Sequence, residues 1–286
     1  MQRALRTLLR RVEPRARRGA ALDTILRALD DAKALGFRTV QLTGGDPLVA
    51  ASCLPAARHA AGLGFDTLEI YTNGLALRGS LFSALCELGA SFAFSFYSHD
   101  PDVHDGITRT PGSQKRTAEA IRSVVDAGLR ARVGIIAFES NRRDLDRTIA
   151  FVLGLGIARD AIGVDVQRGV GRGEMVESSL SWAMPETDGA GHREASRGFT
   201  GSACVAYDGR VYPCIFSRHL PLGDLRERSL RAVLEDPAPV AVALDADASA
   251  WSERLACVEC RVRSALLSGP PEALVPLRAS REAGRP

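Results

Sequence analysis

The chain has 286 residues, of which 45% are hydrophobic and 25% are charged, and its formal net charge at pH 7 is +3. This composition is typical of a folded globular protein, and no segment approaches the roughly 20 apolar residues that a membrane-spanning helix requires. A transmembrane protein, a coiled coil and a disordered chain are therefore excluded, and the small net charge gives no reason to expect a polyanionic partner.

The first half of the chain alternates between two hydrophobic periodicities. Apolar residues three and four positions apart predict a helix over residues 22–32 with Gly36 as its C-cap, and a strand-like run at residues 37–42 follows. The alternation then repeats, with helices expected at residues 51–62, 81–88, 114–127 and 145–155 and strands at residues 67–71, 91–97, 131–138 and 161–167. Such a series predicts right-handed βαβ units and a parallel sheet, and therefore an α/β fold.

The composition changes at several places, and these changes set the expected domain boundaries. The first 19 residues are basic, with seven arginines among the first 18, and they lack the apolar core of a secretory signal, so a cytoplasmic protein is expected. Residues 20–173 form the predicted barrel, 174–200 a linker, 201–268 a small second domain and 269–286 a disordered tail. Because the series opens with a helix, one strand is expected to be missing from the front of the barrel.

Six cysteines divide into two isolated residues and two pairs. Cys53 and Cys86 lie in predicted helices and are expected to behave as small buried hydrophobes. The pairs are Cys204 with Cys214, and Cys257 with Cys260. An Asp-Gly turn signal between the first two predicts a hairpin that brings them close, and the second pair has the spacing of a metal-binding knuckle. Four thiolates suit either zinc or an iron–sulfur cluster, and the alternative is four unrelated buried cysteines.

Polar and glycine-rich loops follow three successive predicted strands. They are Gly44-Gly45-Asp46-Pro47, Thr72-Asn73-Gly74 and Ser95-Phe-Tyr-Ser98. Each is compatible with an ordinary turn, but functional groups of βα barrels gather on the loops at the carboxyl ends of the strands. Three such loops together favour a binding site. His99 and His104 lie in a proline-containing segment, where hydrogen-bonding roles are expected rather than metal ligation.

These motifs resemble those of the radical S-adenosylmethionine superfamily with a C-terminal SPASM or twitch domain. The glycine turn is similar to the family's Gly-Gly-Glu-Pro motif, with Asp46 in place of glutamate, and Tyr71-Thr72-Asn73-Gly74 resembles its third-strand signature. The resemblance implies a partial (β/α)6 barrel with its first strand missing, followed by a cysteine-rich domain. It implies that S-adenosylmethionine is bound by Gly44, Gly45, Asp46, Pro47, Asn73 and Ser95. It also implies that one auxiliary [4Fe–4S] cluster is bound by Cys204, Cys214, Cys257 and Cys260.

The resemblance further implies an activity. Members of the family use an electron, supplied by a donor such as flavodoxin or ferredoxin, to form a 5′-deoxyadenosyl radical that abstracts hydrogen from a substrate. Members with this architecture often modify peptides, so a peptide or other small-molecule substrate is expected, with neither a nucleic acid nor a membrane as partner. The specific catalytic residues and the bond formed are not predicted from the sequence.

One defining motif of the family is missing. The Cys-x3-Cys-x2-Cys loop that holds the cofactor-cleaving [4Fe–4S] cluster belongs before the first helix, and residues 1–19 contain no cysteine. Read one base later, Met1-Gln2 must give cysteine, and Leu5 and Leu8 give cysteine if their codons end in TG and the codons of Arg6 and Leu9 begin with C. The three positions have the missing spacing. We therefore hypothesise a frameshifted or truncated start, with a second cluster only if that motif is restored; a different codon at Leu5 or Leu8 would contradict the frameshift.

Two alternatives remain at this stage. The first is a non-catalytic barrel that serves as a scaffold and keeps a structural zinc or iron–sulfur site, which is compatible with the cysteine-free start of the chain. The second is a zinc-ribbon protein that binds nucleic acid, which accounts for the arginines but not for the alternating strands and helices.

Overall fold

The computed structural model describes residues 21–166, 203–212, 215 and 221–236. By their internal contacts these residues form two compact units. Residues 38–166 belong to the larger βα unit, and helix α2 groups with the described residues from 203 onward. All the domain boundaries predicted from the sequence fall outside the described residues.

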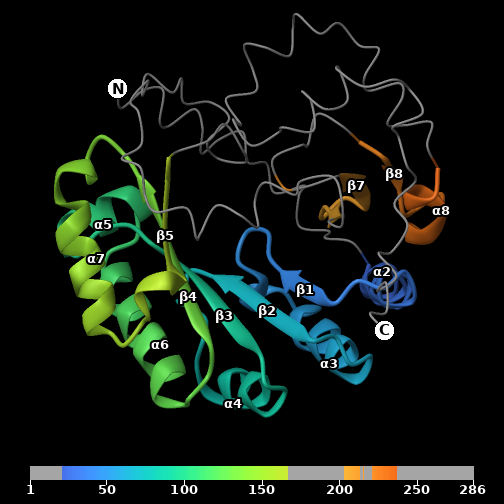
Figure 1. Cartoon of the computed structure of the whole chain (residues 1–286), viewed down its shortest axis with the longest axis horizontal. Helices are drawn as coiled ribbons and strands as arrows, with labels where there is room; N and C mark the ends of the chain where they lie inside the picture. The colour runs from blue at the N-terminus through green and yellow to red at the C-terminus, as the bar shows by residue number, and fades with distance from the viewer. Residues whose placement is uncertain (1–20, 167–202, 213–214, 216–220, 237–286) are drawn as a thin grey trace, which may run out of the picture. The chain divides into compact units, whose positions relative to one another are not determined.

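A five-stranded parallel sheet forms the centre of the βα unit (Figure 1). Its strands follow one another in chain order, so each βαβ crossover joins neighbouring strands. The strands are β1 (Thr39–Leu42), β2 (Thr67–Thr72), β3 (Ser91–Phe96), β4 (Ala131–Ala137) and β5 (Ile162–Val166). All five predicted strands are present, and the predicted α/β partial-barrel class is confirmed.

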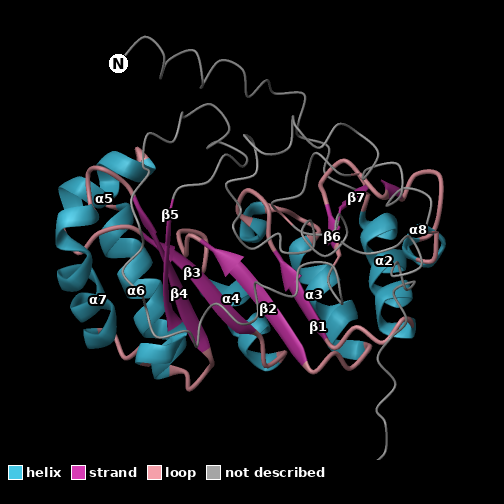
Figure 2. Ribbon diagram, turned by 45° about the horizontal axis from the view of Figure 1, so that its top comes forward, coloured by secondary structure: helices cyan, strands magenta, loops and turns pink. Residues whose placement is uncertain are grey.

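The helices of this unit lie along the sheet (Figure 2). They are α3 (Cys53–Gly62), α4 (Gly79–Glu87), α5 (Pro101–Thr108), α6 (Ser113–Asp126) and α7 (Leu145–Gly154), with single turns of 3₁₀ helix at Pro47–Val49, Arg142–Asp144 and Arg159–Ala161. Four of the five α-helices were predicted. Helix α5 was not among them, because the segment that contains Pro101 was interpreted as a loop or the entry to a helix. Pro101 occupies the first turn of a helix that Asp100 caps.

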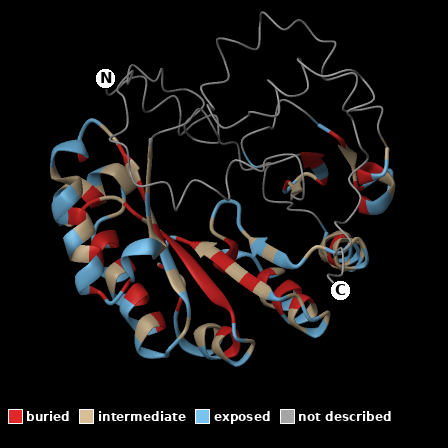
Figure 3. Ribbon diagram, in the orientation of Figure 1, coloured by how far each residue is buried: buried red, intermediate tan, exposed pale blue. Residues whose placement is uncertain are grey.

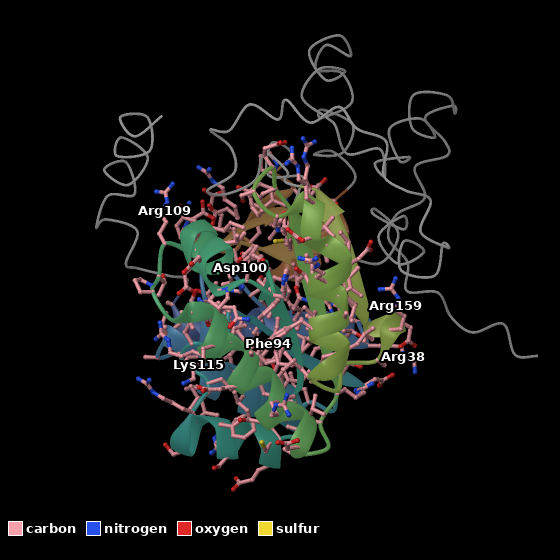
Figure 4. All side chains as sticks on the ribbon, turned by 90° about the vertical axis from the view of Figure 1, so that its left-hand side faces the viewer. Arg38, Phe94, Asp100, Arg109, Lys115 and Arg159 are labelled. Carbon is pink, nitrogen blue, oxygen red and sulfur yellow. The ribbon has the colours of Figure 1, made fainter. Side chains whose placement is uncertain are left out.

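The core lies between the sheet and its helices, and β3 contributes its largest fully buried side chains. They are Phe92, Phe94 and Phe96, which alternate along the strand; the ribbon of β3 is mostly in the colour of buried residues in Figure 3, and Figure 4 labels Phe94 among the side chains at the centre of the view. Phe96 stacks on Phe151 of α7, with ring centroids 5.6 Å apart. Because neighbouring residues of a strand point to opposite faces, the other face of β3 carries only the small side chains of Ser91, Ala93 and Ser95.

The second unit is a three-stranded antiparallel sheet with two helices. Its elements are α2 (Leu22–Ala34), β6 (Cys204–Val205), β7 (Arg210–Tyr212), β8 (Gly223–Asp224) and α8 (Leu230–Leu234). Ala28 of α2 joins Val211, Leu222 and Val233 in one apolar cluster, and Asp31 accepts a hydrogen bond from the backbone N–H of Arg231 at 3.1 Å. The helix that precedes β1 therefore completes the core of the C-terminal unit. No helix among the described residues is long and apolar enough to span a membrane.

Candidate cofactor site at the carboxyl ends of the strands

The loop after β1 contains the two adjacent glycines predicted to bind a ligand. Gly44 and Gly45 have φ angles of +99° and +59°, a backbone region that L-residues with a side chain rarely adopt. A Cβ added at either position would meet no atom within 4 Å. The glycines are therefore required by the turn itself, and the exposed turn leaves space for a ligand against the backbone.

Asp46 connects this loop to the loop after β2. Its Oδ1 accepts a hydrogen bond from the backbone N–H of Leu48 at 3.0 Å, which caps the following 3₁₀ turn. The Thr72 hydroxyl lies 2.9 and 2.8 Å from Oδ1 and Oδ2, and the backbone N–H of Asn73 donates to Oδ2 at 3.2 Å. Pro47, the fourth residue of the predicted motif, is buried in the first turn of the 3₁₀ helix. It shapes the loop and offers no side-chain polar atom to a ligand.

The loop after β2 is fixed on its other side by helix α6. The Thr117 hydroxyl donates to the carbonyl of Asn73 at 2.7 Å, and Asn73 Oδ1 accepts from the backbone N–H of Leu75 at 2.9 Å. A Cβ on Gly74 would lie 3.0 Å from Ala120 and 3.2 Å from Phe94, so the loop approaches the helix too closely for a larger residue. These bonds leave the Nδ2 amide of Asn73 as the part of this exposed side chain that can donate to a ligand.

Ser95, the third predicted position, lies near the end of β3. Its hydroxyl donates to the Tyr71 hydroxyl at 3.3 Å, and the Tyr71 oxygen would be 3.2 Å from a Cβ on Gly134. Gly134 is the register partner of Ser95 on β4. The phenol of β2 thus reaches across β3, above the small Ala93 side chain, as far as β4.

A charged network continues from Tyr71 toward the amino ends of the strands. Arg132 makes a two-pronged ion pair with Glu69, with Nε–Oε2 at 2.7 Å and Nη2–Oε1 at 2.8 Å, and Gln41 donates to Oε1 at 2.5 Å. The Arg132 guanidinium also lies 5.7 Å from the centroid of the Tyr71 ring. Burial raises the pKa of Glu69. The hydrogen bonds and the positive charge of Arg132 lower it by more, so the pKa of Glu69 lies below its ordinary value.

Sequence reasoning missed Gln41, Glu69 and Arg132 as contributors to the site, although it placed Tyr71 and Thr72 in a candidate loop. A signal for the three was available, since polar side chains at alternate positions of otherwise apolar strands mark one face of a sheet. The bond of Thr72 to Asp46 gave no such signal, because Thr72 is buried and Asp46 lies 26 positions earlier.

The two histidines of the β3–α5 region have structural contacts, as expected. His104 is buried, its Nδ1 accepts from the backbone N–H of Tyr97 at 3.3 Å, and burial lowers its pKa to about 4. The backbone N–H of His99 donates to the Thr148 hydroxyl at 3.1 Å. Within the described residues no group of three or more His, Cys, Asp or Glu side chains could hold a metal ion.

The predicted cysteine ligands are described only in part. Cys204 lies on β6, paired with Tyr212 on β7, and the hairpin turn between these strands has Gly209 at φ +86°, so the predicted hairpin is confirmed. The other three ligands, Cys214, Cys257 and Cys260, fall outside the described residues. Four thiols are the donor set that one iron–sulfur cluster requires.

The site residues fit the binding of S-adenosylmethionine but not the binding of the cluster that reduces it. The open glycine turn, the Asp46–Thr72 link and the Asn73 amide together can receive the amino-acid end of S-adenosylmethionine. Residues 1–38 of this sequence offer no thiolate ligand for the cluster that would reduce this cofactor, because the first cysteine in it is Cys53 in α3. No reaction step through that cluster follows from this chain as it stands.

Sequence comparisons identify relatives of both parts of the chain. Residues 10–152 match the model of the radical SAM superfamily, and residues 198–261 match an iron–sulfur cluster-binding domain. The PqqA peptide cyclase of Ruegeria pomeroyi is 28% identical over 137 residues, which are 48% of this chain and 36% of that protein. The "Probable GTP 3′,8-cyclase" of Sulfurisphaera tokodaii is 30% identical over 124 residues, 43% and 39% of the two chains. The matched part of the chain thus spans less than two-fifths of the length of each of these relatives.

Solved structures share the fold at low sequence identity. Streptococcus suis SuiB bound to S-adenosylmethionine matches with a TM-score of 0.57 and 14% identity, over 76% of this chain and 58% of that one. The enzyme anSMEcpe, bound to AdoMet and the Cp18Cys peptide, matches with a TM-score of 0.54 and 13% identity, over 77% and 73%. The matches to the radical SAM superfamily and to the iron–sulfur cluster-binding domain imply that S-adenosylmethionine and [4Fe–4S] clusters are the cofactors. The family match covers half of the sequence and includes strands β1–β4 of the parallel sheet, and the chain belongs to the radical SAM superfamily.

Proposed function

We propose that this chain binds S-adenosylmethionine at the carboxyl ends of β1–β3 and one auxiliary iron–sulfur cluster in its C-terminal unit, as part of a radical enzyme that modifies a peptide. The observation that carries the proposal is the open glycine turn linked through Asp46 to the β2 loop, within a sheet of this family. Gly44, Gly45, Asp46, Pro47, Asn73 and Ser95 form the cofactor site, and Cys204, Cys214, Cys257 and Cys260 bind the cluster.

A peptide is the substrate class that the relatives favour. Two of the curated relatives are PqqA peptide cyclases, and SuiB has been crystallised with the precursor peptide SuiA. The sheet face opposite the phenylalanines has space over β5: the Tyr71 phenol covers Ala93 and reaches Gly134, but no atom lies within 4 Å of a Cβ on Gly163. This space agrees with a substrate that enters as a chain segment.

When bound and reduced, S-adenosylmethionine supplies a 5′-deoxyadenosyl radical that abstracts hydrogen. The residues of this chain would hold and orient the cofactor: the glycine turn would receive its amino-acid end, and the Asn73 amide and the Ser95 hydroxyl would offer hydrogen bonds to its polar groups. We further propose that the reading frame is shifted from the start of the chain to about Pro14, that the restored enzyme takes electrons from flavodoxin or ferredoxin, and that it works in the cytoplasm without a nucleic acid or a membrane.

Anaerobic reconstitution with iron and sulfide tests the cluster assignment. The chain is expected to bind about four irons with the charge-transfer absorption of an iron–sulfur cluster. Cys204→Ser is expected to lower the iron content and weaken this absorption. The matched control is Cys86→Ser in α4, which removes a thiol from the other unit and is expected to change neither. Equal loss in both variants, or binding of one zinc and no iron, would contradict the cluster.

A second candidate function is a non-catalytic scaffold with a structural zinc or iron–sulfur site. The observation in its favour is the lack of any cysteine before Cys53. A scaffold of this kind has no use for a cofactor pocket, so equilibrium dialysis with labelled S-adenosylmethionine separates the two functions. Saturable binding that Gly45→Val abolishes supports the enzyme, and no binding by the iron-loaded chain supports the scaffold.

A further inference from the structure

We propose that helix α2 and the iron–sulfur cluster of the C-terminal unit stabilise each other through one apolar core. In this inference, which rests on the proposed cluster, loading of iron at the four cysteines fixes the helix that leads into β1 and the cofactor loop. In return, the packing of α2 helps the C-terminal unit to retain its iron.

Helix α2 depends on the C-terminal unit for its stability. It has 13 residues, its N-cap position is Ala21, and no side chain caps its first turn. A helix of this length is marginal by itself in water, and an alanine at the N-cap weakens it further. Among the helices and strands of the described part, α2 packs chiefly with α8, and Figures 1 and 2 show the two helices side by side. This packing therefore determines whether the helix forms.

One stripe of α2 contacts the core of the C-terminal unit. Ala28, Ala32 and Leu35 follow one another at intervals of four and three residues, so they lie on one face of the helix. Ala28 is a buried member of the core, and Ala32, Leu35 and Phe37 pack against it. The other buried members are Val211, Leu222, Leu225, Leu230, Val233 and Leu234. The contact thus extends along α2 to a residue that lies two positions before β1.

The elements around this core are packed closely. A Cβ on Gly223 of β8 would lie 2.7 Å from the Val233 side chain, so α8 lies directly against β8. The Asp31 carboxylate of α2 accepts a hydrogen bond from the backbone N–H of Arg231, in the first turn of α8, at 3.1 Å. Because a close-packed interior transmits strain, a change in the small sheet reaches α2 through α8.

The same core flanks a proposed ligand of the cluster. Cys204 lies between Ala203 and Val205, and both of these neighbours pack against the core. Val205 pairs with Val211 on β7, which is fully buried, and Cys204 pairs with Tyr212. A bond between the Cys204 thiolate and iron therefore restrains a hairpin whose apolar residues belong to the core that α2 completes.

The small size of the sheet explains why both contributions matter. Its three described strands contain two or three residues each, and so short a sheet needs a metal or a packing helix to be stable. In domains of this kind metal binding is coupled to folding. Because iron and α2 stabilise the same folded core, each favours the state to which the other binds, and the coupling free energy is equal in both directions.

Hydrogen exchange of the full chain, followed by mass spectrometry with and without reconstituted iron, tests the first direction. The backbone N–H groups of residues 22–34 are expected to exchange several-fold more slowly in the iron-loaded chain. Those of β3, in the βα unit, are the internal reference and are expected to be unchanged. Equal exchange at residues 22–34 in the two forms, at full iron content, would overturn the inference while the cluster stands. Equal slowing in both segments would overturn it as well, because the effect would then be global.

Loss of iron to an excess of chelator tests the reciprocal direction. Ala28→Gln places a long polar side chain at the buried contact and keeps a residue that favours helix, so it is expected to lose iron several-fold faster than the wild type. Ala34→Gln, the same change at an exposed position of α2, is the control and is expected to match the wild type. Asp31→Ala, which removes only the hydrogen bond to Arg231, is expected to have a smaller effect in the same direction. If Ala28→Gln retains iron as firmly as Ala34→Gln, the inference is wrong.

Iron content separates a failure of this coupling from a failure of the proposed cluster. If the reconstituted wild-type chain holds no iron, the cluster assignment fails and the coupling fails with it. Exchange in the iron-free protein still tests the contact of α2 itself, because Ala28→Gln is expected to exchange several-fold faster at residues 22–34 than Ala34→Gln. Equal exchange in these two iron-free variants would show that α2 does not depend on the C-terminal core, which overturns the inference on its own.

Discussion

The Tyr71 hydroxyl lies 3.2 Å from the point at which a side chain on Gly134 would place its Cβ. This close approach lets the phenol of β2 cross β3 and reach the Ser95 hydroxyl. Arg132, two residues before Gly134, lies against the ring of the same tyrosine. Gly134 on β4 therefore determines where Tyr71, two strands away on β2, places its hydroxyl group.

Gly134→Ala is expected to push the Tyr71 hydroxyl away from Ser95 and break their hydrogen bond. The expected cost is about 1 kcal/mol in the free energy of unfolding, with a several-fold weaker affinity for S-adenosylmethionine. Gly163→Ala is the matched control on the adjacent strand, because its Cβ would meet nothing within 4 Å. Denaturant unfolding and cofactor titration check both variants, and equal effects in the two would contradict the steric role of Gly134.

His104 is expected to make stability depend on pH. Its pKa is about 4 in the folded protein, against an ordinary value of 6.5, so the unfolded chain binds the extra proton between these values. The stabilisation is complete above pH 6.5 and is lost as the pH falls toward 4, by up to about 3 kcal/mol. His104→Gln is expected to flatten this dependence in urea unfolding at pH 4–7. A pH dependence in His104→Gln equal to that of the wild type would contradict the assignment.

Cys53 is expected to resist alkylation in the folded protein. Burial, and then the negative charge of Asp46, raise the pKa of its thiol to about 11, so hardly any thiolate exists at pH 8. Mass spectrometry after iodoacetamide treatment is expected to find Cys53 unmodified until the protein is unfolded. Rapid native-state labelling at Cys53 would show that the β1 loop opens.

The raised folded-state pKa of Cys53 also means that this thiol stabilises the fold below about pH 9 and ceases to do so as the pH rises toward 11.

Asn141 is expected to be essential for the position of the β3 loop. Its buried amide donates to the carbonyls of Tyr97 at 2.7 Å and Ile136 at 2.9 Å, and its Oδ1 accepts from the N–H of Phe138 at 2.7 Å. Asn141→Asp keeps the shape but replaces both donors by an acceptor that faces two carbonyls. A loss of about 3 kcal/mol or more in the free energy of unfolding is expected. A change below about 0.5 kcal/mol would mean that these bonds do not fix the loop.

Local sequence patterns predicted the elements well and their tertiary partners poorly. Alternating periodicity located all five strands, and the Asp-Gly turn located the hairpin. The apolar stripe of α2 predicted a helix but not its place, because periodicity does not say which surface covers a face; the structure packs it with the C-terminal strands. Similarly, the loops of the site were visible as glycine motifs, whereas Thr72 and Arg132 depend on contacts with residues 26 and 63 positions away.

The measurement that tests the central claim most directly is 5′-deoxyadenosine formation from S-adenosylmethionine by two anaerobically reconstituted proteins. One is the unaltered chain, and the other carries the segment up to about Pro14 in the shifted frame. The given chain is predicted to bind about four irons and form no 5′-deoxyadenosine, and the restored chain to bind about eight and form it. If neither protein binds iron and both bind one zinc, the radical assignment of this chain is wrong and the scaffold takes its place.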